Sequence, residues 1–135
     1  VIVSEGSNIA DIGSRTVEGC AVVGWGPHRQ MLSKVGGLYC RLWLGWRLGD
    51  ATSGYRAMNR KVLELLSDQP PRSEGFAFQV EVAYRTHQRG LKIVESPIVF
   101  ADRVAGRSKL TTEIVAEALM VVPLLKLCSL THVIE

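Results

Sequence analysis

The sequence lacks the features that would assign it at once to several common classes of protein. Its 135 residues include three cysteines, Cys20, Cys40 and Cys128, which are far apart and form no CxxC or Cys/His pattern. We therefore expect reduced packing residues in a cytosolic compartment rather than disulfides or a metal site. The chain also has no internal repeat and no low-complexity tract.

Long apolar runs and a large net charge are missing as well. No stretch reaches the ~18 uninterrupted apolar residues expected of a membrane-spanning helix. The chain does not start with a basic segment followed by an apolar one, so we expect no signal peptide. The net charge of +3 is too small by itself to indicate a nucleic-acid binder. A hydrophobic content of 47% and a charged content of 21% indicate one globular domain with a core.

What is present is an alternation of short apolar strands and helices, which predicts an α/β architecture. Strands are expected near residues 9–12, near residues 54–58 and in the apolar run at 91–100, and helices over 27–47, 59–66, 76–88 and 111–130. Pro27 suits a helix start, Asn59 a helix cap and Gly90 a helix stop. About three strands are few for a doubly wound sheet, so residues 1–135 are predicted to form a single partial domain.

The segment 27–47 is the most one-sided part of the sequence. Its apolar residues recur at helical spacing and form a wide stripe. It contains no acidic residue, and its basic residues besides His28 are Arg29, Lys34, Arg41 and Arg47. Two interpretations remain open: a helix lying at an anionic membrane surface, or a core helix with solvated basic residues. Arg29 and Ser33 share one helix face near its start, an arrangement that suits phosphate binding.

Three further charged positions have two interpretations each. Asp50, in "GDATSGYRA", is either a turn residue or a carboxylate that faces a cleft. Glu81 is either a partly buried carboxylate that holds a basic partner or an exposed helix position. The segment 101–109 carries Asp102, Arg103, Arg107 and Lys109 around a glycine. It is either a solvated surface loop or a flexible flap that folds onto phosphate groups.

Three motifs then occur together, in a fixed order. They are "GSR…VVGWGPHRQMLSKVGGLYCRLWLG", "DATSGYRAMNRKVLELL" and "SEGFAFQVEVAYRTHQRGLKIVESPIVFADRVAGRSKL". With these motifs the chain resembles the polyprenyl-phosphate (dolichol-phosphate) mannosyltransferases of glycosyltransferase family 2, over about residues 11–125. The resemblance implies the acceptor-side half of a GT-A fold, with few strands, an interface helix at 27–47, an acceptor loop at 101–109 and a C-terminal helix at 111–130.

The resemblance also implies an activity and a set of site residues. The family transfers mannose from GDP-mannose to a polyprenyl (dolichyl) phosphate at the cytoplasmic face of the membrane, with inversion and a divalent metal, Mg²⁺ or Mn²⁺. Asp50 and Arg103 match catalytic positions of the family. The residues that match its acceptor-phosphate site are Arg15, Arg29, Ser33 and Lys109.

The sequence departs from the family at two points. The acidic metal-binding motif that should precede "GSR" is missing, and Gly49 replaces a basic residue often found before the aspartate. We therefore expect a fragment without the donor and metal site, inactive alone, whose intact form is peripheral to or anchored in the membrane. Two alternatives stay open: a glucosyl or other hexosyl transferase acting on undecaprenyl phosphate, and a non-catalytic module that binds lipid phosphate at a membrane surface. A nucleic-acid partner is not expected, because the basic residues share a helix with a tryptophan-rich apolar face.

Overall fold

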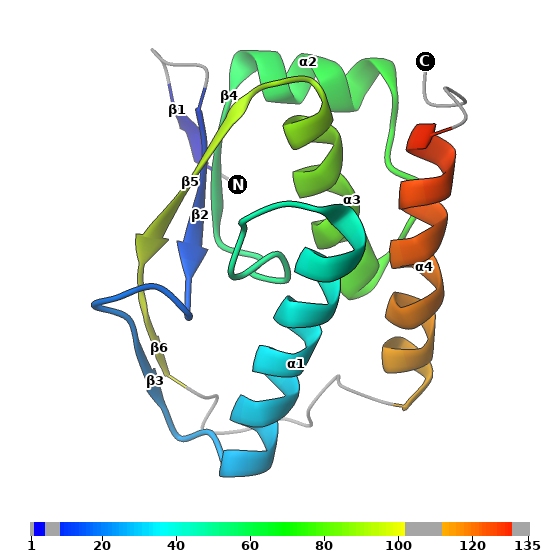
Figure 1. Ribbon diagram of the computed structural model, residues 1–135. Coiled ribbons are helices and arrows are strands. Elements are labelled where there is room, and N and C mark those ends of the chain that lie inside the picture. Colours follow the sequence, from blue (N-terminus) through cyan, green and yellow to red (C-terminus); the bar gives the residue numbers. More distant parts are fainter. Residues whose placement is uncertain (1, 5–8, 102–111, 131–135) are drawn as a thin grey trace.

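The chain folds into a mixed β-sheet with helices packed on one face (Figure 1). This computed structural model describes residues 2–4, 9–101 and 112–130. The main sheet has the strand order β1-β4-β2-β5, and a second sheet pairs β3 with β6. The strands are β1 (Ile2–Ser4), β2 (Ile9–Ser14), β3 (Ala21–Val23), β4 (Arg56–Asn59), β5 (Lys92–Pro97) and β6 (Val99–Ala101). The helices are α1 (Pro27–Leu44), α2 (Arg60–Asp68), α3 (Gly75–Gln88) and α4 (Thr112–Leu130). The predicted α/β class is confirmed.

Strand β2 lies inside the main sheet, between β4 and β5. It runs antiparallel to β4, with Ala10 opposite Met58, and parallel to β5, with Ser14 opposite Pro97. Because side chains alternate across a strand, Ala10, Ile12 and Ser14 share one face, and all three are buried. The strand therefore presents one core face to the helices and carries its last residue to the edge where the candidate site lies.

The described residues form six strands, so the expectation of about three is wrong. The three predicted strands are present as β2, β4 and β5, but the run at 91–100 divides into β5 and β6. Ile98 makes the transition, because its N–H donates to the carbonyl of Ser14 at the end of β2 while its own carbonyl accepts from Ala21 at the start of β3. Strands β1 and β3 have three residues each, too few to show a period-two pattern.

Helix α1 begins at the predicted proline but ends earlier than expected. Pro27 is at the first helical position, where a missing N–H costs nothing. After Leu44 the helix stops because Gly45 adopts φ +71°, and the N–H of Gly45 donates to the carbonyl of Arg41 at 3.0 Å. The prediction of a helix over 27–47 is therefore three residues too long.

The other helices follow the sequence signals closely. The side chain of Asn59 accepts a hydrogen bond from the N–H of Val62 at 3.1 Å and so caps α2, as predicted. Helix α3 ends just before Gly90, which has φ +69°. Helix α4 contains Pro123, and residue 111, where this helix was expected to begin, lies outside the described residues.

Glu81 on α3 is the buried carboxylate that one interpretation of the sequence predicted. Its side chain accepts hydrogen bonds from the backbone N–H groups of Arg72 and Ser73, and it forms an ion pair with Arg85 at 2.6 Å. Burial alone would raise the pKa of Glu81. The hydrogen bonds from Ser73 and Arg72 and the charge of Arg85 outweigh burial and hold the pKa below its ordinary value. The carboxylate thus holds the turn that precedes α3.

The larger hydrophobic core lies between β2 and the helices α1, α3 and α4, and it extends into the loop after α1. Its buried residues are Ile12, Cys40, Leu44, Trp46, Leu48, Ala51, Val80, Ala83, Tyr84, Val122 and Leu125. A smaller cluster below α2 contains Ala10, Met58, Val62 and Val82. Both clusters use the same face of the main sheet, which fixes α1 beside the ends of the strands.

Two neighbouring glycines of α1 give a matched test of how closely this helix approaches the following loop. A Cβ added to Gly37 would lie 2.9 Å from the backbone carbonyl oxygen of Gly49, whereas one added to Gly36 would meet nothing within 4 Å. We expect Gly36→Ala to stabilise the chain by about 0.5–1 kcal/mol, because alanine is the better helix former. Gly37→Ala should destabilise it by about 1–3 kcal/mol, because backbone atoms must move apart.

Urea denaturation of the two variants and the unmodified chain measures both effects. Equal stabilisation by the two alanines would contradict the close approach of α1 to the loop.

Candidate functional site

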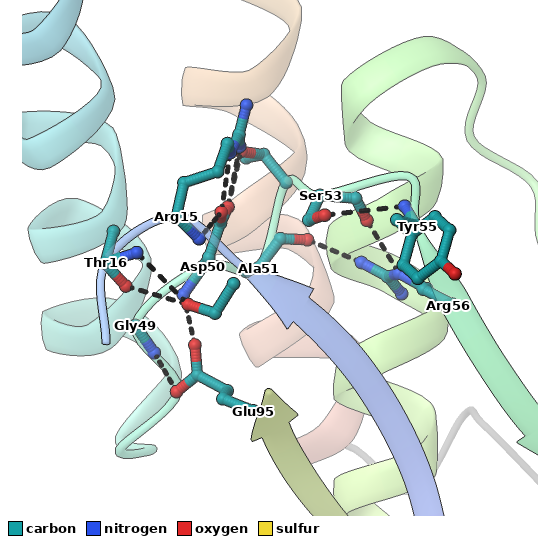
Figure 2. A network of polar contacts seen from close by, with 11 residues as sticks. Arg15, Thr16, Gly49, Asp50, Ala51, Ser53, Tyr55, Arg56 and Glu95 are labelled. Carbon is teal, nitrogen blue, oxygen red and sulfur yellow. Dashed lines mark hydrogen bonds and ion pairs between the residues drawn. The ribbon is translucent and has the colours of Figure 1, made fainter. Parts of the chain in front are cut away.

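The candidate site lies where the end of β2 meets the loop between α1 and β4 (Figure 2). Arg15 directly follows β2, while Asp50 belongs to the segment 49–55, called the Asp50 loop below. Glu95 reaches the same place from β5, which runs parallel to β2 and lies beside it. Segments 35 and 45 residues apart in sequence are therefore joined by side-chain contacts.

Arg15 and Asp50 form a two-pronged ion pair. Arg15 Nε donates to Asp50 Oδ2 at 2.7 Å, and Nη2 donates to Oδ1 at 2.7 Å. The backbone N–H of Arg15 also donates to Oδ2 at 3.0 Å, and Nη2 donates to Thr52 Oγ1 at 2.9 Å. The side chains are 11% and 2% exposed. Asp50 is thus both a loop residue and a buried ion-pair partner, and its two oxygens are engaged by Arg15.

The ionisation of Asp50 follows from these contacts. Burial by itself would raise the pKa of its carboxyl group, but the hydrogen bonds and the positive charge of Arg15 outweigh burial. The pKa of Asp50 therefore lies below its ordinary value, and the carboxylate is charged at neutral pH. A charged Asp50 holds Arg15 with its guanidinium plane fixed, as bidentate arginine–carboxylate pairs do.

The Asp50 loop is held from two sides, as Figure 2 shows. Glu95 accepts hydrogen bonds from the backbone N–H groups of Gly49 and Asp50, both at 2.9 Å. Arg56, buried at the start of β4, donates to the carbonyls of Ala51 at 2.7 Å and Ser53 at 2.9 Å. Burial lowers the pKa of Arg56 to about 10, while the charge of Asp50 opposes the shift, so Arg56 is still a cation at neutral pH.

Arg15 also belongs to a cluster of arginines and aromatic rings. Its guanidinium carbon lies 5.3 Å from the ring centroid of Trp25 and 5.5 Å from that of Phe100. Arg29, in the first turn of α1, lies 4.5 Å from the centroid of the Trp25 ring. Trp25 and Phe100 pack edge to face at 5.5 Å. Two residues predicted to bind phosphate, Arg15 and Arg29, are therefore brought to one indole ring by cation–π contacts.

The remaining predicted site residues divide into two groups. Ser33 lies one turn beyond Arg29 on α1 and therefore on the same side of the helix, where it is half-buried. Arg103 and Lys109 lie outside the described residues, and their roles stay predictions. The described chain reaches Ala101 of β6, one residue beyond the Phe100 ring that contacts Arg15.

Sequence reasoning did not single out Trp25 or Glu95. A signal for Glu95 exists, because it is the single acid in the otherwise apolar and polar-neutral run "IVESPIVF" and therefore needs a partner inside the fold. Trp25 has a weaker signal in its place just before a helix-starting proline. Neither position could be assigned a role without knowing which segments meet at the end of β2.

The described residues do not supply a ligand set for a divalent metal. No group of three or more His, Cys, Asp or Glu side chains that could hold a metal ion occurs within 2–4, 9–101 and 112–130. Both oxygens of Asp50 are occupied by Arg15. What the arrangement offers is positive charge and hydrogen-bond donors at the edge of the sheet, a combination that suits the binding of an anion.

Comparison with known proteins finds twelve curated relatives, two of which are described below. The chain is 43% identical over 109 residues to the undecaprenyl-phosphate mannosyltransferase of Micrococcus luteus, an alignment that covers 81% of this chain and 45% of the relative. It is 39% identical over 117 residues to the polyprenol monophosphomannose synthase of Mycolicibacterium smegmatis, covering 87% of this chain and 44% of the relative. The chain thus spans less than half the length of these relatives, and the resemblance stated from its motifs is confirmed. No protein-family model and no solved structure matches it.

The ion pair predicts a specific dependence of stability on pH. Asp50→Asn leaves the Arg15 charge buried without its partner, so we expect a loss of about 3 kcal/mol at pH 7. Because folding lowers the pKa of Asp50, its stabilising effect is complete above the unfolded value of ~3.9 and disappears as pH falls through the lower folded value.

Urea denaturation of both chains between pH 7 and pH 2.5 measures this difference. It should stay constant down to about pH 4 and shrink below that pH. A difference that keeps its full size at pH 2.5 would rule out an ionised Asp50 as its source.

Proposed function

We propose that this homologue of polyprenyl-phosphate mannosyltransferases is the acceptor-side part of an enzyme that transfers mannose from GDP-mannose to a polyprenyl phosphate. The alignments with the two mannosyltransferases support the sugar and the acceptor class. Their partial coverage supports a division of labour in which an upstream half, in the GT-A manner, supplies the donor and metal site. The observation that carries the proposal is the pair of arginines, Arg15 and Arg29, on the Trp25 ring.

Transfer of a sugar to a polyprenyl phosphate requires cations around the phosphate groups more than it requires a general base. Its phosphate group is already an anion and a nucleophile, so attack on the anomeric carbon of mannose requires no proton removal. In the transfer, a phosphate oxygen forms the new bond to that carbon as the bond to the pyrophosphate oxygen breaks, and GDP leaves with the electron pair. Arg15 and Arg29 would bind the acceptor phosphate, and Ser33 would add a hydroxyl donor from the same helix face.

Arg15 is well suited to this role because Asp50 fixes it without using all of its donors. Its Nε and Nη2 atoms bind Asp50 and Thr52, and Nη1 has no hydrogen bond to any described residue. Asp50 would act in the reaction mainly through Arg15. Arg103 and Lys109, from the sequence that follows Phe100, would bring further positive charge to the pyrophosphate and the acceptor.

We also propose that α1 and α4 rest on the membrane that holds the lipid acceptor. The apolar stripe of α1 is exposed rather than packed in a core: Met31, Leu32, Val35, Leu38, Leu42 and Trp43. Helix α4 packs beside α1, where the hydroxyl of Tyr39 donates to the carbonyl of Leu119 at 2.8 Å. The exposed apolar residues of α4 are Leu119, Met120, Leu124, Leu127 and Leu130. No helix within the described residues is long and apolar enough to cross a membrane.

The charge around this apolar surface supports the same conclusion. Lys34, Arg41 and Arg47 are exposed on or just after α1, and the segment contains no acid. Basic side chains beside exposed tryptophan and leucine are typical of helices that lie at an anionic bilayer surface. The acceptor phosphate of a membrane lipid would then meet Arg29 at the start of the same helix. The site would lie at the cytoplasmic face of the membrane, because the proposed donor is the nucleotide sugar GDP-mannose.

A substitution in the stripe tests membrane binding. Leu42 is 75% exposed, so Leu42→Glu should leave the fold intact while it weakens sedimentation with liposomes that contain anionic lipid by about tenfold. Arg60→Gln, on the exposed side of α2, changes the charge by the same amount and should have little effect. Equal binding by the unmodified chain and Leu42→Glu would remove α1 from the proposed membrane surface.

The transfer reaction is tested with a full-length protein that includes the donor half. Label from GDP-mannose should enter the organic phase in the presence of a polyprenyl phosphate and a divalent metal, and label from UDP-glucose should not. Arg29→Ala should raise the KM for the polyprenyl phosphate at least tenfold, since it removes a charged contact to the phosphate. Label from UDP-glucose alone would favour the glucosyl alternative. No label from either donor, with liposome binding intact, would favour the lipid-binding module.

A further inference from the structure

Glu95 makes contacts that nothing in the proposed chemistry requires of it. It lies on β5, and each of its carboxylate oxygens accepts one backbone hydrogen bond from the Asp50 loop: Oε2 from Gly49 and Oε1 from Asp50. Figure 2 shows the carboxylate below the loop, with Asp50 between it and Arg15. Glu95 thus binds the backbone of the same residue whose side chain binds Arg15.

We propose that Glu95 is a positioning residue for acceptor binding, which holds the backbone of Gly49 and Asp50 so that the Asp50 carboxylate fixes Arg15 toward the acceptor phosphate. The inference rests on the proposed function for the identity of the ligand. The contacts that join Glu95, Asp50 and Arg15 do not depend on which ligand is bound.

The requirement for a carboxylate follows from the two donors. Two neighbouring N–H groups point at two different oxygens, so the side chain must accept at both positions. A glutamine would have to turn its NH₂ group toward one of these N–H groups, which removes one hydrogen bond and places two donors face to face. Placing Glu95 beside Asp50 brings two anions together, an unfavourable contact that the donated N–H groups offset.

Gly49 provides the space that this contact needs. A Cβ at this position would lie 2.5 Å from Thr16 Oγ1 and 3.2 Å from Glu95 Oε1. A larger residue would push the carboxylate or the threonine away from the loop. The glycine that departs from the family's usual basic residue is therefore matched, in this chain, to a glutamate that approaches the backbone directly.

The far side of the loop is held by a group of opposite charge. Arg56 donates to the carbonyls of Ala51 and Ser53, whereas Glu95 accepts from the N–H groups of Gly49 and Asp50. An anion thus binds N–H groups at the start of the loop, and a cation binds carbonyls one to three residues later. With Arg56 holding one side, loss of Glu95 should release the Gly49–Asp50 end selectively.

The test measures the pKa of Asp50 by carbon NMR in this chain and in Glu95→Gln. The charged groups that face Asp50 are Arg15 after β2, Arg56 on β4 and Glu95 on β5. Removal of a neighbouring negative charge alone would lower the pKa of Asp50 further. If Glu95 positions the carboxylate, the variant should instead raise the pKa toward the ordinary value of ~3.9, because the Arg15 contact loosens. A pKa that falls or does not change would overturn the proposal.

Glu81→Gln is the matched control. Glu81 is also a carboxylate that accepts backbone hydrogen bonds from a turn, but it lies on α3 and has Arg85 as its partner. This variant should lower the melting temperature and leave the pKa of Asp50 unchanged. If both variants moved that pKa alike, a general loss of stability would explain the effect and Glu95 would have no positioning role.

Binding of farnesyl phosphate, a short soluble polyprenyl phosphate, gives the second readout. Calorimetry should show about tenfold weaker binding by Glu95→Gln and unchanged binding by Glu81→Gln. If the unmodified chain does not bind this probe, the proposed function fails for the chain alone, while the NMR experiment still tests the positioning of Asp50. Should Glu95→Gln not fold, Glu95→Asp keeps two acceptor oxygens at a shorter reach. In Glu95→Asp the pKa of Asp50 should rise by a smaller amount than in Glu95→Gln, and an unchanged pKa would again overturn the proposal.

Discussion

The buried pair of Arg15 and Asp50 is the constraint on which the rest of the site depends. Either charge alone would be costly at this depth, since removing one partner of a buried pair typically costs 3–5 kcal/mol. The pair therefore forces the end of β2 and the loop after α1 to stay together. Glu95 and Arg56 then fix that loop to β5 and β4. Three strands and the loop after α1 therefore meet through charged contacts.

Helix α1 connects this polar site to an apolar surface. Its buried residues, Cys40 and Leu44, anchor its second half in the core, while Leu38 and Leu42 are exposed. Arg29 lies in its first turn, against the Trp25 ring. One helix thus carries a cation at its start and an apolar stripe along its length. Such an arrangement matches the two parts of a phosphorylated lipid, a charged head and a hydrocarbon tail.

Sequence patterns predicted the parts of the fold that local signals determine. The cap at Asn59, the stop at Gly90 and the start at Pro27 act within a few residues, so the helix positions followed from them. The turn from β5 to β6 at Ile98 did not, because it depends on hydrogen bonds to two other strands. Likewise, the exposure of the α1 stripe could not be decided from periodicity, which shows that one face is apolar but not what covers it.

The site was predictable only in part for the same reason. The roles of Arg15, Arg29 and Asp50 came from resemblance to a family rather than from spacing, and the ion pair joins residues 35 positions apart. No local pattern encodes such a contact. Glu95 is the opposite case, because a lone acid within an apolar strand indicates a partner inside the fold. Only the register of β5 beside β2, however, places the Asp50 loop against Glu95.

The contact of two arginines with one indole ring makes the charge interactions of the site dependent on salt concentration. The guanidinium carbons of Arg15 and Arg29 lie 5.3 Å and 4.5 Å from the same ring centroid, so they are separated by no more than about one Debye length at 0.1 M salt, ~10 Å. Low ionic strength strengthens their mutual repulsion when no ligand is bound, and also their attraction for any anion. Screening weakens both, so the difference between the empty and the occupied site is greatest in dilute salt. An anion bound by the two arginines should therefore be held more weakly as the ionic strength rises.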